Sequence, residues 1–125
     1  MKPILIIEDN DKNLKLVRDV LRFKGYSTLE ATTAAEGLRL AREERPALVL
    51  MDILLPDFDG ITALARLRGD RSTHAIPVIA LSASAMPDDH ERIIKSGFDA
   101  YLTKPIEIKS FVDLVERLIG KAEKA

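Results

Sequence analysis

Short apolar runs alternate with longer segments of helical periodicity five times along the chain. The apolar runs cover residues 4–7, 27–31, 47–51, 78–81 and 100–102. Four of them are strongly apolar, which is typical of strands that are buried on both faces of a parallel sheet. The second run is weaker and alternates apolar with polar residues, as an edge strand does. We therefore expect five strands, with the second at an edge of the sheet.

The segments between the runs carry apolar residues at the spacing of a helix face. The residues expected to face inward are Leu14, Val17 and Leu21; Ala34, Leu38 and Ala41; Ile61, Leu64 and Leu67; Ile93 and Ile94; and Phe111, Leu114, Val115 and Leu118. Thr33 and Glu36 have the spacing of a capping box at the start of the second helix. Gly25 and Gly97 stand where the first and fourth helices should end.

Five strand–helix units with short connections predict an α/β fold, in which helices cover both faces of a parallel sheet. The architecture is a three-layer α/β/α sandwich. The length of 125 residues suits one domain, which we expect to span residues 1–120 and to be followed by a polar tail at 121–125.

Composition narrows the classes of function. The chain has 19 basic and 20 acidic residues, a balance that argues against a nucleic-acid partner. It has no cysteine, which excludes a disulfide framework and a thiolate metal site. The apolar stretches are far too short to span a membrane, and the N-terminus is unlike a signal peptide. We expect a cytoplasmic protein with no membrane or nucleic-acid partner.

Candidate chemistry gathers at the carboxyl ends of the predicted strands, where open α/β sheets bind their ligands. The first strand is followed by Glu8 and Asp9, the third by Asp52, the fourth by Ser82 and the fifth by Lys104. Taken alone, each residue also has an ordinary explanation as a strand-end acid, a helix cap or a solvated lysine. Together at one edge, they favour a functional site.

Three carboxylates this close would repel one another unless a cation lay among them. Oxygen ligands of this kind suit Mg²⁺. A metal ion and a lysine around one carboxylate would also stabilise a phosphoryl group in transfer. Asp52 is then the candidate nucleophile, and the product is an aspartyl phosphate.

These residues and their neighbours resemble the receiver domain of bacterial two-component response regulators, and the resemblance runs from end to end. The motifs that carry it are Glu8-Asp9, Asp52 with Pro56 and Gly60, Ser82-Ala83, Lys104-Pro105, and Tyr101 three residues before the lysine. The resemblance implies a flavodoxin-like (βα)₅ fold with strand order 2-1-3-4-5. It also implies a phosphoacceptor protein, with self-catalysed phosphotransfer and dephosphorylation, rather than a classical enzyme.

The resemblance also assigns the metal ligands. Asp9, Asp52 and the backbone carbonyl of Leu54 would bind Mg²⁺, and Glu8 would act directly or through a metal-bound water. Asp52 would take the phosphoryl group from a phosphohistidine on a histidine kinase.

The other residues of these motifs would respond to that phosphoryl group. Ser82 would hydrogen-bond the phosphoryl oxygen, and Lys104 would pair with it. The bond between Lys104 and Pro105 is expected to be cis. Ser82 and Tyr101 would act as a switch.

Phosphorylation would thus reshape the face made by the fourth helix, fifth strand and fifth helix. That face includes residues 83–86, His90, Ile94, Tyr101 and residues 105–111, and it would bind a downstream protein. His74 and His90 are both expected at the surface.

Three functions remain open. The first is a stand-alone response regulator, since the chain stops after the fifth helix; an excised receiver from a longer regulator is also possible. Sequence stretches around the fourth helix resemble receivers of cell-division and polarity regulators and of hybrid kinases. The second is a phosphorelay intermediate or phosphate sink that passes phosphate to a histidine phosphotransfer protein. The third is a small phosphohydrolase, which is disfavoured because Leu54 stands where such enzymes have a second aspartate.

Overall fold

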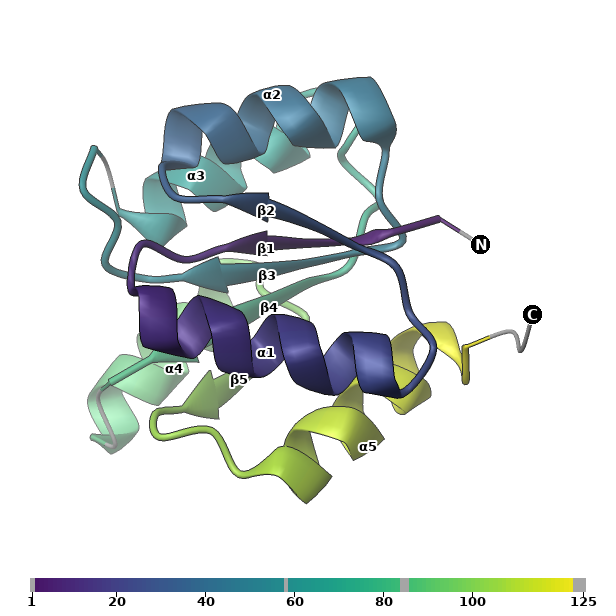
Figure 1. Cartoon of the computed structure of the whole chain (residues 1–125). Helices are drawn as coiled ribbons and strands as arrows, with labels where there is room; N and C mark the ends of the chain where they lie inside the picture. Colours follow the sequence, from purple (N-terminus) through teal and green to yellow (C-terminus); the bar gives the residue numbers. More distant parts are fainter. Residues whose placement is uncertain (1, 58, 84–85, 123–125) are drawn as a thin grey trace.

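A computed structural model describes residues 2–57, 59–83 and 86–122 of the chain, and in these residues strands and helices alternate (Figure 1). The elements are β1 (Ile4–Ile7), α1 (Asp11–Phe23), β2 (Thr28–Ala31), α2 (Ala34–Glu44), β3 (Leu48–Asp52), α3 (Gly60–Arg68), β4 (Val78–Ser82), α4 (Pro87–Lys95), β5 (Ala100–Thr103) and α5 (Ile108–Ile119). All five predicted strands and all five predicted helices are therefore present.

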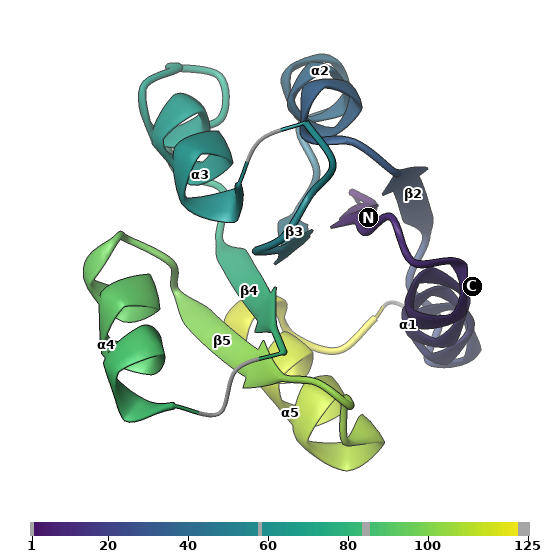
Figure 2. The same cartoon turned by 90° about the vertical axis from the view of Figure 1, so that its left-hand side faces the viewer.

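The strands form one parallel sheet in the order β2-β1-β3-β4-β5. Helices α2, α3 and α4 cover one face of the sheet, and α1 and α5 cover the other (Figure 2). This arrangement confirms the three-layer α/β/α sandwich, the predicted strand order and the edge position of the second strand. All five strands run in one direction, so their carboxyl ends meet at one edge.

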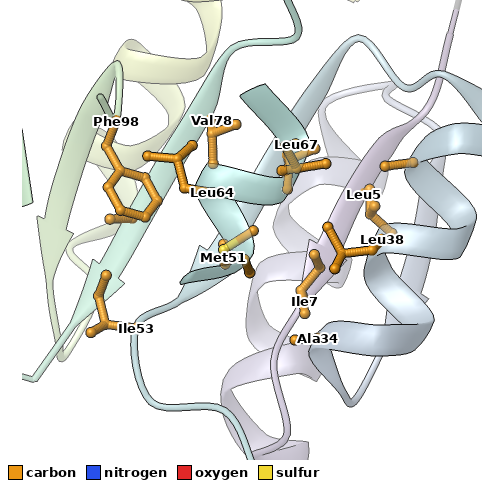
Figure 3. Packing of buried hydrophobic residues seen from close by; sticks show 14 of the residues in the cluster. Leu5, Ile7, Ala34, Leu38, Met51, Ile53, Leu64, Leu67, Val78 and Phe98 are labelled. Carbon is orange, nitrogen blue, oxygen red and sulfur yellow. The ribbon is translucent and has the colours of Figure 1, made fainter. Parts of the chain in front are cut away.

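Alternate residues of each strand feed two hydrophobic clusters, because successive side chains point to opposite faces of a sheet. Leu5, Ile7 and Met51 pack beneath α2 and α3, where Leu64 and Leu67 meet them (Figure 3). On the other face, a second cluster joins the remaining strand residues to α1 and α5. Each fully buried leucine or isoleucine stabilises the fold by about 2 kcal/mol relative to exposure.

Local sequence fixes the starts of the helices. Asn10 caps α1 by accepting a hydrogen bond from the backbone N–H of Asn13 at 3.0 Å. Thr33 caps α2 in the same way, through the N–H of Glu36 at 3.1 Å. The carboxylate of Glu36 accepts from the N–H of Thr32 rather than from that of Thr33, so the predicted capping box is displaced by one residue.

One residue that was predicted to face inward is exposed in the structure. Ile94 was expected to face inward, but its side chain is 43 % exposed while Ile93 is buried. Adjacent helix residues point about 100° apart, and the short helix α4 has only a narrow buried face. On α5, Leu114 and Leu118 are half-buried and pack against the core cluster, as predicted for the inward face.

The start of β1 and the end of α5 lie on the side of the sheet opposite its carboxyl edge (Figure 1). Ala122, in the predicted polar tail, still packs against the cluster formed by α1 and α5. Residues 123–125 of that tail lie outside the described residues. Of the helices in the described ranges, the longest has 13 residues, and none combines the length and apolar character that a bilayer crossing requires.

Candidate functional site

The register of β1 and β3 places two carboxylates side by side. Ile7, the last residue of β1, is paired with Met51, so the next residues, Glu8 and Asp52, stand at the same level of the sheet. The backbone of Glu8 continues the pairing by donating to the carbonyl of Ala31 at 3.0 Å. Both acids are thus held by strand geometry rather than by a loose loop.

The register of β4 and β5 adds a hydroxyl and an ammonium to the same edge. Ser82 is the last residue of β4 and is paired with Thr103. The backbone N–H of Lys104 donates to the carbonyl of Ser82 at 2.7 Å, so the lysine leaves the sheet beside the serine. The peptide bond between Lys104 and Pro105 is cis, as expected.

The three acids differ in burial. Glu8 is fully buried and Asp52 is 5 % exposed, whereas Asp9 is open to solvent. One oxygen from each carboxylate lies within 4.8 Å of the other two. The predicted cluster of carboxylates is therefore assembled, with two members under the surface and one at the rim.

Lys104 bridges the two buried acids. Its Nζ lies 2.8 Å from Oδ2 of Asp52 and 2.9 Å from Oε2 of Glu8. Burial favours the neutral amine, but the two carboxylates outweigh this effect and raise the pKa of Lys104 above its ordinary value. The lysine is therefore a fixed positive charge at this edge.

Glu8 has a strongly perturbed pKa. Burial, reinforced by the neighbouring Asp52, raises the pKa of Glu8 to about 7, although Lys104 and the N–H of Asn10 oppose the rise. Oε1 accepts that N–H at 3.1 Å. Oε2 forms an ion pair with Lys104, and among the described residues no hydrogen bond to this oxygen is found besides that pair.

This donor set fits a hard divalent cation. It offers three carboxylates whose oxygens are close together, and in the part of the chain that the structure describes the buried Oε2 of Glu8 has only the ion-paired Lys104 beside it. Oxygen ligands are what Mg²⁺ prefers, and a positive charge would relieve the repulsion that raises the pKa of Glu8. Leu54, whose carbonyl the resemblance adds to the ligand set, follows in the exposed loop after β3.

A hollow of about 440 Å³ opens beside these groups. Its lining residues are Asp52, Ile53, Leu54, Ser82, Ala83, Asp89, Arg92, Ile93 and Lys104. Sequence reasoning missed Asp89 and Arg92, which enter the lining from α4. Their three-residue spacing beside Ile93 was the available signal, but it has no chemical signature of its own.

Tyr101 lies apart from this hollow, on β5. It is half-buried and packs against the hydrophobic cluster beneath α4. Its ring lies 4.1 Å from that of His90, centroid to centroid, with 38° between the ring planes. His90 is therefore half-buried, not the surface residue that was expected, whereas His74 is exposed as predicted. Ser84 and Ala85, expected on the same face, lie outside the described residues.

Comparison with known proteins places these features in one family. Residues 4–116 match the response regulator receiver domain. The polar-differentiation response regulator DivK of Brucella anthropi is 43 % identical over 121 residues, which are 97 % of this chain and 98 % of the relative. DivK of Brucella ovis is 42 % identical over the same share of both chains.

Solved structures agree with the sequence relatives. A putative response regulator from Chloroflexus aurantiacus has a TM-score of 0.89 at 30 % identity and covers 96 % of this chain and 100 % of its own. The receiver domain of the sensor histidine kinase PA1611 from Pseudomonas aeruginosa, solved with a magnesium ion in its active-site cleft, has a TM-score of 0.87 at 32 % identity and covers 96 % and 98 %.

Receiver domains in general act as phosphoacceptors, bind Mg²⁺ at an acidic pocket and interact with histidine kinases and downstream targets. The acidic pocket at the carboxyl edge of this sheet has the same character. The family match covers most of the chain, and the relatives match nearly all of it. The chain therefore belongs to the response regulator receiver domains of two-component systems.

Proposed function

We propose that this chain is a response-regulator receiver that accepts a phosphoryl group from a histidine kinase on Asp52. The observation that carries the proposal is the environment of that carboxylate. It is nearly buried, lies 2.8 Å from the ammonium of Lys104, is grouped with Glu8 and Asp9, and still lines an open hollow. A carboxylate held this way has both a route to a phosphoryl donor and a counter-charge for the product.

In the transfer, a carboxylate oxygen of Asp52 attacks the phosphorus of a phosphohistidine. The new oxygen–phosphorus bond forms as the nitrogen–phosphorus bond breaks, and the imidazole nitrogen leaves with the bonding electron pair. A Mg²⁺ ion held by Glu8, Asp9, Asp52 and the carbonyl of Leu54 would offset the charge on the phosphoryl oxygens. The backbone N–H of Leu54 already donates to Oδ1 of Asp52 at 3.0 Å and orients the nucleophile.

Lys104 and Ser82 would hold the product. Once Asp52 is phosphorylated, its carboxyl group is an uncharged mixed anhydride and the negative charge lies on the phosphoryl oxygens, so Lys104 would turn from the carboxylate to these oxygens. The hydroxyl of Ser82 lines the same hollow and would donate a hydrogen bond to a phosphoryl oxygen. Both side chains thus change partner on phosphorylation.

The same change would reach Tyr101 through β4 and β5. Ser82 is paired with Thr103, and Tyr101 stands two residues earlier on the same strand, against His90 of α4. A move of Ser82 toward phosphate would bias Tyr101 between two packings, which is a population shift rather than a new fold. Ser82 and Tyr101 are therefore the proposed switch.

The output surface is the face formed by α4, β5 and α5. Exposed apolar side chains lie on it or beside it: Met86 is 64 % exposed, Ile94 43 % and Ile108 49 %. Apolar side chains in the open are typical of surfaces that bind another protein. The phosphoryl donor would be a histidine kinase or a histidine phosphotransfer protein in the cytoplasm. Residues 1–120 would form the receiver domain. Neither a nucleic acid nor a membrane would be needed.

Intact mass spectrometry after incubation with acetyl phosphate tests the proposal. We expect one phosphoryl group on the wild type with Mg²⁺, none without Mg²⁺, and none on Asp52→Asn. Asp113→Asn, which removes an exposed acid from α5, is the matched control and should be phosphorylated like the wild type. Phosphorylation of Asp52→Asn, or none on the wild type from either acetyl phosphate or a phosphorylated kinase, would refute it.

A further inference from the structure

The loop between β3 and α3 is tied to the start of α2 by one carboxylate. Oδ1 of Asp57 accepts the backbone N–H of Ala34 at 2.9 Å, and Oδ2 accepts that of Ala35 at the same distance. The two amides belong to the first turn of a helix that lies 23 and 22 residues earlier in the chain. Two short bonds to successive amides hold the carboxylate in one orientation.

The base of this loop is closed by its own backbone. The N–H of Gly60 donates to the carbonyl of Ile53 at 2.8 Å, and the N–H of Ile53 donates to the carbonyl of Leu81 at 3.0 Å. The closure is tight, because a Cβ on Gly60 would lie 2.9 Å from the carbonyl oxygen of Asp52. The loop therefore begins after β3 and ends at the start of α3 at two points that are hydrogen-bonded to each other.

Beyond that base, the loop runs over the surface. Leu54 is 72 % exposed, Pro56 is exposed, and Leu55 packs against the hydrophobic cluster beneath α2 and α3. The pair of bonds from Asp57 to α2 is a polar anchor for this outer part. Leu54 lies between the closed base and that anchor, so both ends of its segment are restrained.

Helix α2 does not depend on Asp57 alone for its cap. Thr33 already accepts the N–H of Glu36 at 3.1 Å. A helix leaves its first amides without partners and attracts negative charge, so Asp57 finds a complementary seat there. These two hydrogen bonds restrain the loop as well as complete the cap of the helix.

We propose that Asp57 is a positioning residue for the cation site, because it holds the loop segment that carries Leu54 against α2. It touches neither the cation nor the phosphoryl group. It acts by restraining the segment that carries Leu54, whose N–H already donates to Asp52, so that the site need not order the loop when a cation binds. The inference rests on the proposed function and deepens it, since it concerns the Mg²⁺ that phosphorylation requires.

Calorimetric titration of the metal-free protein with Mg²⁺ tests this role directly. We expect Asp57→Ala to weaken Mg²⁺ binding about tenfold, the lower end of what loss of an outer-shell contact costs a metal site. Asp57→Asn keeps one acceptor oxygen and should fall between this variant and the wild type. Titration at about 0.5 M salt, where exposed charges are screened, separates positioning from the loss of a nearby negative charge.

Thr33→Ala is the matched control, since it removes a cap from the same end of α2 without touching the loop. It should leave Mg²⁺ affinity within about twofold of the wild type while it lowers the melting temperature as a lost cap does. Amide hydrogen exchange at Leu54 and Leu55 should speed up in Asp57→Ala and not in Thr33→Ala.

Equal Mg²⁺ affinity for Asp57→Ala and the wild type would overturn the inference, as would an equal loss in Thr33→Ala or a wild type that binds no Mg²⁺. A loss seen in Asp57→Ala at low salt and absent at high salt would overturn it too. A wild type that binds Mg²⁺ but takes no phosphate would refute the proposed function and leave the positioning role standing.

Discussion

The interior of the sheet and the buried part of its carboxyl edge are opposite in chemistry. Strands β1, β3 and β4 are apolar up to the edge, and their interior residues have no exposure. At the edge stand Glu8, Asp52 and Ser82, whose residues are at most 5 % exposed. Burial of apolar surface stabilises a fold, whereas burial of a carboxylate costs free energy unless it is compensated.

The contrast indicates which part of the molecule sets stability and which part has been arranged for chemistry. The edge retains two buried carboxylates that share a single lysine, although apolar residues would be cheaper there. Its free energy therefore depends on pH and on cations, while that of the interior does not. Variants in the two regions should differ in this dependence as well as in the size of their effect.

The largest effect is expected from the interior. Leu64→Ala removes a fully buried side chain of α3 from the cluster in Figure 3 and leaves a cavity. We expect the free energy of unfolding to fall by about 4 kcal/mol, within the range for buried leucines. Urea denaturation with and without Mg²⁺ measures this loss, which should be the same under both conditions.

Phe23→Ala provides the control for size without burial. Phe23 is 88 % exposed at the end of α1, so its loss should change stability by less than about 0.5 kcal/mol. A Leu64→Ala loss that shrank markedly in Mg²⁺ would mean that the interior and the edge are coupled, and the contrast between them would fail.

A smaller effect, and one that depends on pH, is expected from Glu8→Gln in metal-free buffer. The folded pKa of Glu8 is about 7, above its ordinary value of 4.5. A raised folded pKa means that stability is fully present below about pH 4.5 and is lost as the pH rises through about 7. The wild type should lose on the order of 3 kcal/mol over this range because of Glu8, at 1.36 kcal/mol per unit.

Glu8→Gln lacks that titration, so the difference between the two proteins isolates it from every other group. Melting temperatures from about pH 5 to 8 with a chelator should converge at the acid end and diverge in favour of the variant at the alkaline end. Parallel curves would mean that Glu8 is not held in a strained, buried state. Saturating Mg²⁺ should remove the difference at high pH, because the cation stabilises the ionised acid.

The sequence was sufficient for the fold because the interior is built from repeated local signals. The runs at β1 and β4 and the periodicity of α1 and α2 each point to one structure, and parallel connections leave few ways to assemble them. Errors arose where a signal was short. Ile94 was assigned to the interior, since two adjacent isoleucines on a nine-residue helix do not reveal which one faces the sheet.

The edge was predictable only in part. Glu8, Asp52 and Lys104 could be placed together because strand ends meet at one edge. The ion pairs of Lys104 with Glu8 and Asp52 could not be predicted, since they depend on how far each side chain extends along the edge of the sheet. The hydrogen bonds from α2 to Asp57 could not be predicted either. An acid in a turn can make many different contacts, and only the folded chain brings it to Ala34.

The smallest effect tests whether the edge stores repulsion. In metal-free protein at about pH 8, where Glu8 is ionised, Asp52→Asn leaves Lys104 paired with one carboxylate instead of two, and we expect stability to rise by about 1 kcal/mol. At about pH 6 the gain should vanish, because protonated Glu8 no longer repels Asp52 and the substitution then only removes an ion pair. Urea denaturation at the two pH values measures both, and saturating Mg²⁺ should reverse the order, since the wild type binds the cation more tightly and gains stability in proportion. A variant less stable than the wild type at the alkaline pH would show that Lys104 fully compensates the two acids, and the edge would then resemble the interior more than its chemistry suggests.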